Sequence, residues 1–224
     1  MKKVVVIGCG MDVTTKKRGS FITDNFDEVI VMKRSIFHLE SHSEYIGTPT
    51  IWVNGGREWR KYDWITSKIE EKLKWREIYD KNINFNLQQK IYNILDKSNI
   101  REVWLNYLER DDHYSFTPHN NIPIKNISMN LRDRSDSTYF CSTGMQTIIY
   151  AINSGYDVYY FGVDSFRKGH HYYPECTSVF MDPETLNTDD IYDYNHKCSN
   201  YLKENREIKK LIDQGRLKHI DTVC

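Results

Sequence analysis

The residue types best suited to chemistry in this chain are Ser142, Thr143 and Gly144, which stand directly before a stretch of helical period at 145–152. Serine and threonine are good helix caps, and glycine lets another group approach the backbone closely. The first turn of a helix has N–H groups without an intrahelical acceptor, and the helix dipole adds positive potential there. Positions 142–144 therefore predict a phosphate-binding site.

A second candidate phosphate site lies near the start of the sequence. The β-branched run at 4–7 ends in Gly8, Cys9 and Gly10, which is the strand-then-glycine pattern of a nucleotide-binding first turn. The full GxGxxG pattern is absent, so this signal is weak by itself. A second β-branched run ends in polar residues that begin with Lys33.

Two histidine segments complete the set of candidate groups. His171 and Tyr172 lie a short loop after a predicted strand, and His196 opens a predicted C-terminal helix. Histidine exchanges protons near neutral pH, so either imidazole could serve as an acid or a base. Adjacent histidines in a loop are more often plain surface residues. Their position directly after the strand is what favours a functional reading.

In chain order these segments resemble the four sialyl motifs of the family 29 sialyltransferases. Residues 8–34 resemble the long motif, and residues 142–162 resemble the short motif. His171 to Tyr173 resemble the third motif, and His196 resembles the histidine of the very short motif. The resemblance covers nearly the whole chain and is strongest at the short and third motifs.

The resemblance implies an inverting, metal-independent glycosyltransferase that moves a sugar from a CMP-activated donor to an acceptor hydroxyl, by default on a glycan. It implies a Rossmann-like fold, the sialyltransferase-type variant of GT-A. His196 would be the catalytic base, and His171 with Tyr172 would hold the leaving phosphate. The residues implied in binding the donor nucleotide are Gly8, Cys9, Gly10, Lys33, Ser142, Thr143, Gly144, Asp164 and Tyr172.

The chain departs from the family pattern at several positions. Cys9 and Lys33 replace two asparagines that contact the donor nucleotide in the family, which puts the identity of the donor in doubt more than its class. Pro174 displaces the acid of the third motif by one position. The residue five after His196 is Tyr201, and the nearest acid is Glu204.

The acceptor is left open by the sequence. Basic and aromatic residues interleave around Arg57, Trp59 and Arg60, and such a patch could stack on a sugar or on a nucleic-acid base. A solvated charged face is the plainer interpretation. The alternatives to a glycan acceptor are a hydroxyl on a modified base in DNA, with a different sugar donor, and a non-catalytic nucleotide-binding protein. Retention of both histidines argues against the last.

One cluster has the composition of a metal site. Asp111, Asp112 and His113 are the residue types that hold Mn²⁺ or Mg²⁺ in other glycosyltransferases. Adjacent carboxylates point apart, however, and no third ligand has a suitable spacing. We therefore interpret this segment as a solvated loop and expect neither a metal nor another cofactor, the nucleotide-sugar being a substrate.

The elements that would position these residues alternate between strands and helices, which predicts one α/β domain over 1–224 with a mostly parallel sheet. Strands are predicted at 4–8, 27–34, 49–53, 102–107, 158–162 and 217–220. Helices are predicted at 63–79, 85–97, 142–154 and 197–214, with Gly155 and Gly215 as the C-terminal caps of the last two. Residues 18–20 are predicted as loop, and 181–193 as a lid or a featureless loop.

Composition indicates the cellular compartment of the protein and the kinds of partner it can bind. Lys plus Arg and Asp plus Glu number 31 each, so no overall field attracts nucleic acid or an anionic membrane. No apolar run reaches the roughly 18 residues of a membrane span, and the start resembles a first strand and not a signal peptide. The 5 cysteines are widely spaced, which favours a reducing compartment. We expect a cytoplasmic protein. The secretory members of the sialyltransferase family are membrane-anchored, so the resemblance implies a relative that is bacterial, or viral in a host cytosol.

Overall fold

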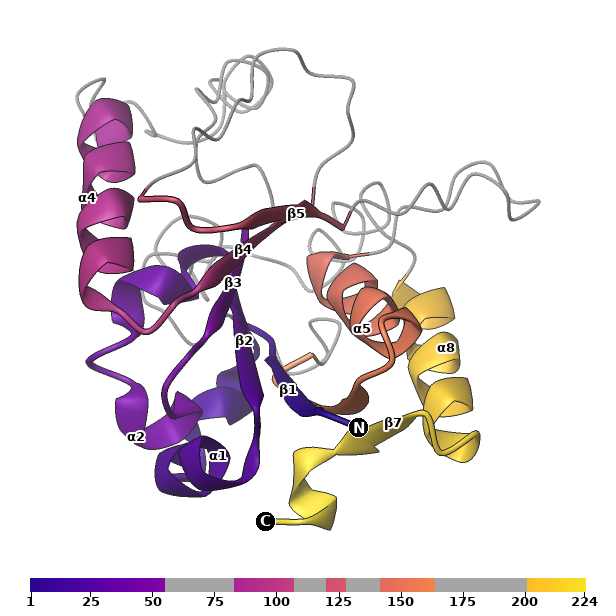
Figure 1. The fold of residues 1–224 in the computed structure, drawn as a ribbon. Coiled ribbons are helices and arrows are strands. Elements are labelled where there is room, and N and C mark those ends of the chain that lie inside the picture. Colours follow the sequence, from indigo (N-terminus) through magenta and orange to yellow (C-terminus); the bar gives the residue numbers. More distant parts are fainter. Residues whose placement is uncertain (55–82, 107–119, 128–141, 164–200) are drawn as a thin grey trace, which may run out of the picture.

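A computed structural model describes residues 1–54, 83–106, 120–127, 142–163 and 201–224. These residues form a seven-stranded sheet with the order β5-β4-β3-β2-β1-β6-β7 (Figure 1). The strands are β1 (Lys3–Ile7), β2 (Glu28–Met32), β3 (Ile51–Asn54), β4 (Glu102–Leu105), β5 (Ile124–Asn126), β6 (Asp157–Phe161) and β7 (Leu217–His219). Every neighbouring pair is parallel. The predicted α/β class is thereby confirmed.

Helices cover both faces of this sheet. The α-helices are α1 (Gly19–Asn25), α2 (Ser43–Ile46), α4 (Ile83–Lys97), α5 (Thr143–Asn153) and α8 (Tyr201–Asp213), and the short 3₁₀ segments are η1 (Met11–Thr14), η2 (Lys33–His38) and η5 (Ile220–Thr222). Phe26, at the end of α1, meets Tyr159 at 5.1 Å between ring centroids, whereas Tyr150 of α5 meets Trp104 at 4.9 Å. Successive side chains of a strand point to opposite faces of the sheet. The strand register therefore places Tyr159 and Trp104 on opposite faces, so α1 and α5 cover different faces of the sheet.

The central strands are buried because both of their faces are covered. Every residue from Val4 to Ile7 is fully buried, and Val29 to Met32 are at most 3% exposed. Parallel strands covered on both sides are typically continuous apolar runs of this kind, without polar alternation. The β-branched runs that predicted these two strands therefore also account for their place at the centre.

Two glycines end helices as the sequence predicts. Gly155 has φ +81° and Gly215 has φ +66°, the left-handed region that glycine adopts without strain. The residue after each glycine donates its backbone N–H to a carbonyl in the last turn of the helix. The N–H of Tyr156 donates to the carbonyl of Ala151 at 3.2 Å, and the N–H of Arg216 donates to the carbonyl of Leu211 at 2.9 Å. Both helix ends are of the Schellman type.

Two elements differ from the sequence-based expectation. Residues 18–20, predicted as loop, include the start of α1, whose N-cap Arg18 makes no capping bond with its side chain. The strand β5 was not predicted, because it is only 3 residues long and lies at the sheet edge. The predicted helix at 63–79, the segment 109–121 and the segment 181–193 fall wholly or largely outside the described residues. None of the helices within the described ranges is long and apolar enough to cross a membrane.

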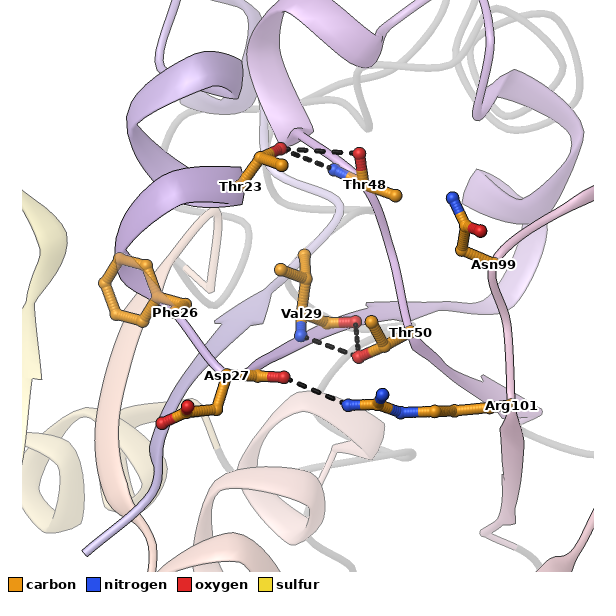
Figure 2. Close-up of a pocket in the computed structure, with 8 residues that line it drawn as sticks. All are labelled: Thr23, Phe26, Asp27, Val29, Thr48, Thr50, Asn99 and Arg101. Carbon is orange, nitrogen blue, oxygen red and sulfur yellow. Dashed lines mark hydrogen bonds between the residues drawn. The ribbon is translucent and has the colours of Figure 1, made fainter.

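A polar network joins three strands at the amino edge of the sheet. The hollow there is about 470 Å³ and is drawn in Figure 2. It is lined by Thr23, Phe26, Asp27, Val29, Thr48, Thr50, Asn99 and Arg101. The Thr50 hydroxyl accepts the N–H of Val29 at 3.0 Å and donates to buried Glu28 at 2.8 Å. Arg101 donates to the same Glu28 oxygen at 2.8 Å. These bonds tie β2, β3 and β4 together where the strands begin.

Replacing Thr50 by valine tests this network. Valine fills nearly the same space but cannot accept the Val29 N–H, which is left buried without this partner. We expect Thr50→Val to lower the free energy of unfolding by about 1–3 kcal/mol. The measurement is a urea titration in which the midpoint shifts while the slope stays constant.

Thr50→Ser is the matched control, because it keeps the hydroxyl and loses only a methyl group. It should lose less stability than the valine variant. Equal stability of Thr50→Val and the parent protein would show that the hydroxyl is not needed at this edge.

Candidate functional site

The strand order creates a switch point at the carboxyl edge of the sheet. From β1 the chain continues to β2 on one side, and later elements return to place β6 on the other side of β1 (Figure 1). At such a point the connections leave in opposite directions and open a crevice beyond the strand ends, which is where ligands bind in open α/β sheets. The segment that contains Gly8, Cys9 and Gly10 begins at the end of β1 and therefore lies at this point.

The ends of β1 and β6 are packed in direct backbone contact. The N–H of Gly8 donates to Phe161 at 2.9 Å, and the N–H of Gly10 donates to Gly162 at 2.8 Å. A Cβ atom at Gly8 would lie 1.9 Å from the carbonyl oxygen of Gly162. No side chain fits in that space, so the packing alone requires glycine at position 8. Gly162 itself has φ +68°.

Both predicted phosphate segments meet at Val163. A Cβ at Gly8 would lie 2.8 Å from Cγ2 of Val163, and a Cβ at Gly144 would lie 3.1 Å from Cγ1 of the same side chain. The turn after β1 and the first turn of α5 therefore flank one valine. Segments more than 130 positions apart in the sequence are brought to one place, as the sequence-based hypothesis of a shared site requires.

The N-terminus of α5 presents unsatisfied N–H groups at this place. Ser142 is the N-cap, as predicted, and its Oγ accepts the N–H of Met145 at 3.2 Å. The N–H groups of Thr143 and Gly144 have no hydrogen-bond acceptor among the residues that the structure describes. Together with the dipole of an 11-residue helix, these two groups can bind an anion.

Lys33 occupies the end of β2 in a strained conformation. Its φ is +55°, in the left-handed region that only glycine, asparagine and aspartate visit readily. The indole N–H of Trp52 donates to its carbonyl at 2.8 Å and helps to hold this conformation. Cys9 lies next to it, with its buried sulfur 3.8 Å from the carbonyl oxygen of Met32. The structure thus brings the positions of Cys9 and Lys33 together just beyond the carboxyl ends of the neighbouring strands β1 and β2.

A buried carboxyl group from α8 completes the site. Glu204 lies in the first turn of α8 and is 1% exposed, and one of its oxygens accepts the N–H of Ser142. The other oxygen, Oε2, is buried and has no hydrogen-bond partner in the part of the chain that the structure describes. The carboxyl group therefore links the N-termini of α5 and α8, which lie side by side in Figure 1.

Burial raises the pKa of the Glu204 carboxyl above its ordinary value. Removing the carboxylate from water disfavours the charged form. The hydrogen bonds from Ser142 and the positive charge of Lys33 act in the opposite direction and lower the pKa, but burial is the larger effect.

The predicted site residues divide into two groups. Those that the structure brings to the switch point are Gly8, Cys9, Gly10, Lys33, Ser142, Thr143 and Gly144. Those that lie outside the described residues are Arg57, Trp59, Arg60, Asp164, His171, Tyr172 and His196. For the second group the assigned roles stay predictions from the sequence.

The structure adds three residues to the carboxyl edge of the sheet that the sequence did not identify as site residues. Glu204 was noted only as an acid near the very short motif, and its bond to Ser142 spans 62 positions. Asn54 ends β3, and Asn106 directly follows β4; both are buried. The N–H of Asn106 donates to the carbonyl of Asn54 at 2.9 Å. A polar residue directly after an apolar strand is the sequence signal that could have identified the two asparagines.

The described part of the site has groups suited to anion binding and no metal-binding cluster. Within the described ranges, His, Cys, Asp and Glu side chains form no group of three that could hold a metal ion, and the segment containing Asp111, Asp112 and His113 lies outside these ranges. The hollow in Figure 2 lies at the opposite, amino edge of the sheet and does not contribute to the switch point.

Comparison with known proteins gives no further assignment: no protein-family model matches the chain, and no curated protein matches its sequence.

The buried carboxyl of Glu204 predicts a specific dependence of stability on pH. The pKa of Glu204 is raised in the native state, so the native state keeps this proton to a higher pH than the unfolded state does. Glutamates of an unfolded chain have a pKa of about 4.3. Stability is full below the unfolded pKa and is lost as pH rises through the native pKa. We expect Glu204→Gln to be more stable than the parent protein at pH ~7, by about 1.4 kcal/mol for each unit of pKa difference.

Chemical denaturation at several pH values measures this difference. The gap between Glu204→Gln and the parent protein should close as the pH falls, because both side chains are then neutral in both states. Glu204→Ala is the contrasting variant: it leaves the Ser142 N–H without its acceptor and should be less stable at every pH. A constant gap between Glu204→Gln and the parent protein would contradict a raised pKa.

Proposed function

We propose that this protein is a Rossmann-like glycosyltransferase of the sialyltransferase type, which moves a sugar from a CMP-activated donor to an acceptor hydroxyl in the cytoplasm. The observation that supports it best is the meeting of the Gly8 turn and the α5 N-terminus on either side of Val163. In the resemblance to the sialyl motifs, these are the donor-binding parts of the long and short motifs. A nucleotide phosphate would bind at the N–H groups of Thr143 and Gly144.

The conformation of Lys33 gives independent support to the alignment of the long motif. The family has asparagine at this position, and asparagine is one of the few residue types that adopts positive φ readily. In this chain the same position has φ +55° although it holds a lysine. A backbone that favours asparagine is therefore retained where the resemblance requires one. Lysine adds a positive charge, which suits a phosphate-bearing donor.

The reaction in this proposal is a direct displacement. The oxygen of the acceptor hydroxyl forms a bond to the anomeric carbon while the bond from that carbon to the donor phosphate breaks. His196 takes the hydroxyl proton, and the departing phosphate keeps the electron pair. His171, Tyr172 and the first turn of α5 stabilise the negative charge that grows on phosphate. The transition state has positive character on the sugar ring.

A thermal-shift series with nucleotides tests the donor class. CMP, UMP, UDP and GDP are added at matched concentrations, and we expect CMP to give the largest rise in melting temperature. A ligand at ~100 times its Kd adds about 2.7 kcal/mol of stability, which is easily detected. A larger shift with UDP or GDP would mean that the donor has changed. No shift with any of the four would overturn the proposal.

Lys33→Asn is the matched variant for this series. Asparagine tolerates the positive φ, so the fold should be kept and any change in nucleotide preference reports on contacts at position 33. We expect weaker binding of all four nucleotides, because one positive charge is lost near the phosphate site.

Substitution of the two histidines separates binding from chemistry. We expect His196→Ala to lower turnover by about 10²–10⁴-fold while CMP binding changes little, because a base acts only on the acceptor. His171→Ala should weaken both CMP binding and turnover. The measurements are sugar transfer from a CMP-sugar and CMP affinity by calorimetry. Parent-like turnover of His196→Ala would contradict its role as the base.

A further inference from the structure

The carboxyl group of Glu204 stands beside the anion-binding turn with one oxygen unused. Oε1 accepts the Ser142 N–H, while Oε2 is buried and has no hydrogen-bond partner within the described ranges. Buried polar atoms are nearly always hydrogen-bonded, so an orphaned oxygen in a 1% exposed side chain needs an explanation. The carboxyl lies at Ser142, directly before Thr143 and Gly144, whose N–H groups have no acceptor among the described residues. This position suggests that the partner of Oε2 is a ligand bound at the same turn.

Few charged groups face this carboxyl within the described residues. From α5 it receives the bonds of Ser142, and the first turn of that helix has no titratable side chain. From the end of β2 it receives the charge of Lys33. On its own helix, Glu207 follows one turn later and is paired with Lys210 at 3.6 Å. Lys33 is therefore the one charged group of these that acts on Glu204.

We propose that the N-terminus of α5 binds a phosphate or other tetrahedral dianion together with one proton, which Glu204 takes up, and that Glu204 is a positioning residue for the anion-binding turn. The identity of the dianion as the donor phosphate rests on the proposed function. The proton-linked anion site itself rests only on Glu204, Ser142 and the first turn of α5.

The physical reason is charge repulsion in a buried setting. An ionised Glu204 would face an incoming dianion across the first turn of α5, where low solvent access makes like charges repel strongly. A proton on Oε2 removes this repulsion, and the new O–H can donate to the anion. Oε1 continues to accept the Ser142 N–H, so the turn keeps its position. Burial raises the pKa of this carboxyl, which already favours its protonated form.

Coupling between anion binding and protonation of Glu204 makes the affinity for the anion depend on pH. If binding takes up one proton, the affinity falls by up to tenfold for each pH unit above the pKa of the free site. A glutamine at position 204 is neutral at every pH and keeps a carbonyl oxygen for Ser142. Glu204→Gln should therefore bind the anion with little pH dependence and, above the pKa of Glu204 in the free protein, more tightly than the parent protein.

The test is calorimetric titration of the whole protein with sulfate, a dianion whose own charge does not change over this pH range. Titrations at the alkaline end of the pH range, above the pKa of Glu204 in the free protein, in two buffers of different ionisation enthalpy give the number of protons taken up. We expect an uptake that approaches one proton in the parent protein and a lower value in Glu204→Gln. Affinities measured from acid to alkaline pH should diverge between the two proteins.

Each outcome decides the proposal. Proton uptake that disappears in Glu204→Gln supports it, and equal uptake or equal pH dependence in both proteins overturns it. Failure of sulfate to bind at any pH also overturns it. If Glu204→Gln does not fold, the proton count of the parent protein alone still decides, because an uptake near zero contradicts the proposal.

Parallel titrations with CMP separate this inference from the proposed function. Sulfate binding with proton uptake but no CMP binding would leave the anion site standing and refute the nucleotide donor. CMP binding whose pH dependence is the same in the parent protein and in Glu204→Gln would leave the proposed function standing and refute the role of Glu204.

Discussion

The backbone contact between Gly8 and Gly162 is the constraint on which the arrangement of the molecule depends. It joins β1, which leads into the β2–β5 half of the sheet, to β6, which leads to β7. The hydrogen bonds of Gly8 and Gly10 continue the pairing of β1 with β6 past the last strand residue. Because a Cβ at Gly8 would lie 1.9 Å from a carbonyl oxygen, any side chain there would push the two halves apart.

This close approach also determines the geometry of the site. With the strand ends in contact, Val163 is directed between Gly8 and Gly144, and the first turn of α5 lies within van der Waals distance of the switch point. Nucleotide-binding proteins use such glycines for ligand approach, and in this chain Gly8 is required by strand packing. A site at this position therefore follows from the packing of the sheet, and its chemistry follows from the helix that comes to rest against it.

Glu204 links the first turns of two helices at this edge of the sheet. The N-termini of α5 and α8 come together at the carboxyl edge, and two positive helix ends in contact need a negative group between them. Glu204 supplies it, but burial makes its charge unfavourable, and its second oxygen has no hydrogen-bond partner among the described residues. Burial outweighs the hydrogen bonds from Ser142 and the charge of Lys33, so the pKa of the carboxyl is raised, and shifted pKa values are common at functional positions.

Much of the secondary structure could be predicted from the sequence because its signals are local. The β-branched runs of β1 and β2, the cap at Ser142 and the glycines at 155 and 215 each depend on a few adjacent residues. Where local signals were weak the prediction failed. α1 has no side-chain cap at Arg18, and β5 is a short edge strand stabilised by its pairing with β4.

The sequence by itself determined the α/β class, the helix caps, the glycine turn after β1 and the polar residues after β2. These features follow from local backbone preferences and from the periodic spacing of apolar residues. Only the tertiary structure decided the strand order, the positive φ of Lys33 and the burial of Glu204 against Ser142. Those features arise from contacts between residues distant in the chain. Ser142 and Glu204, for example, are separated by 62 positions. A residue's charge, strain and partners depend on what packs around it, and no local pattern specifies that.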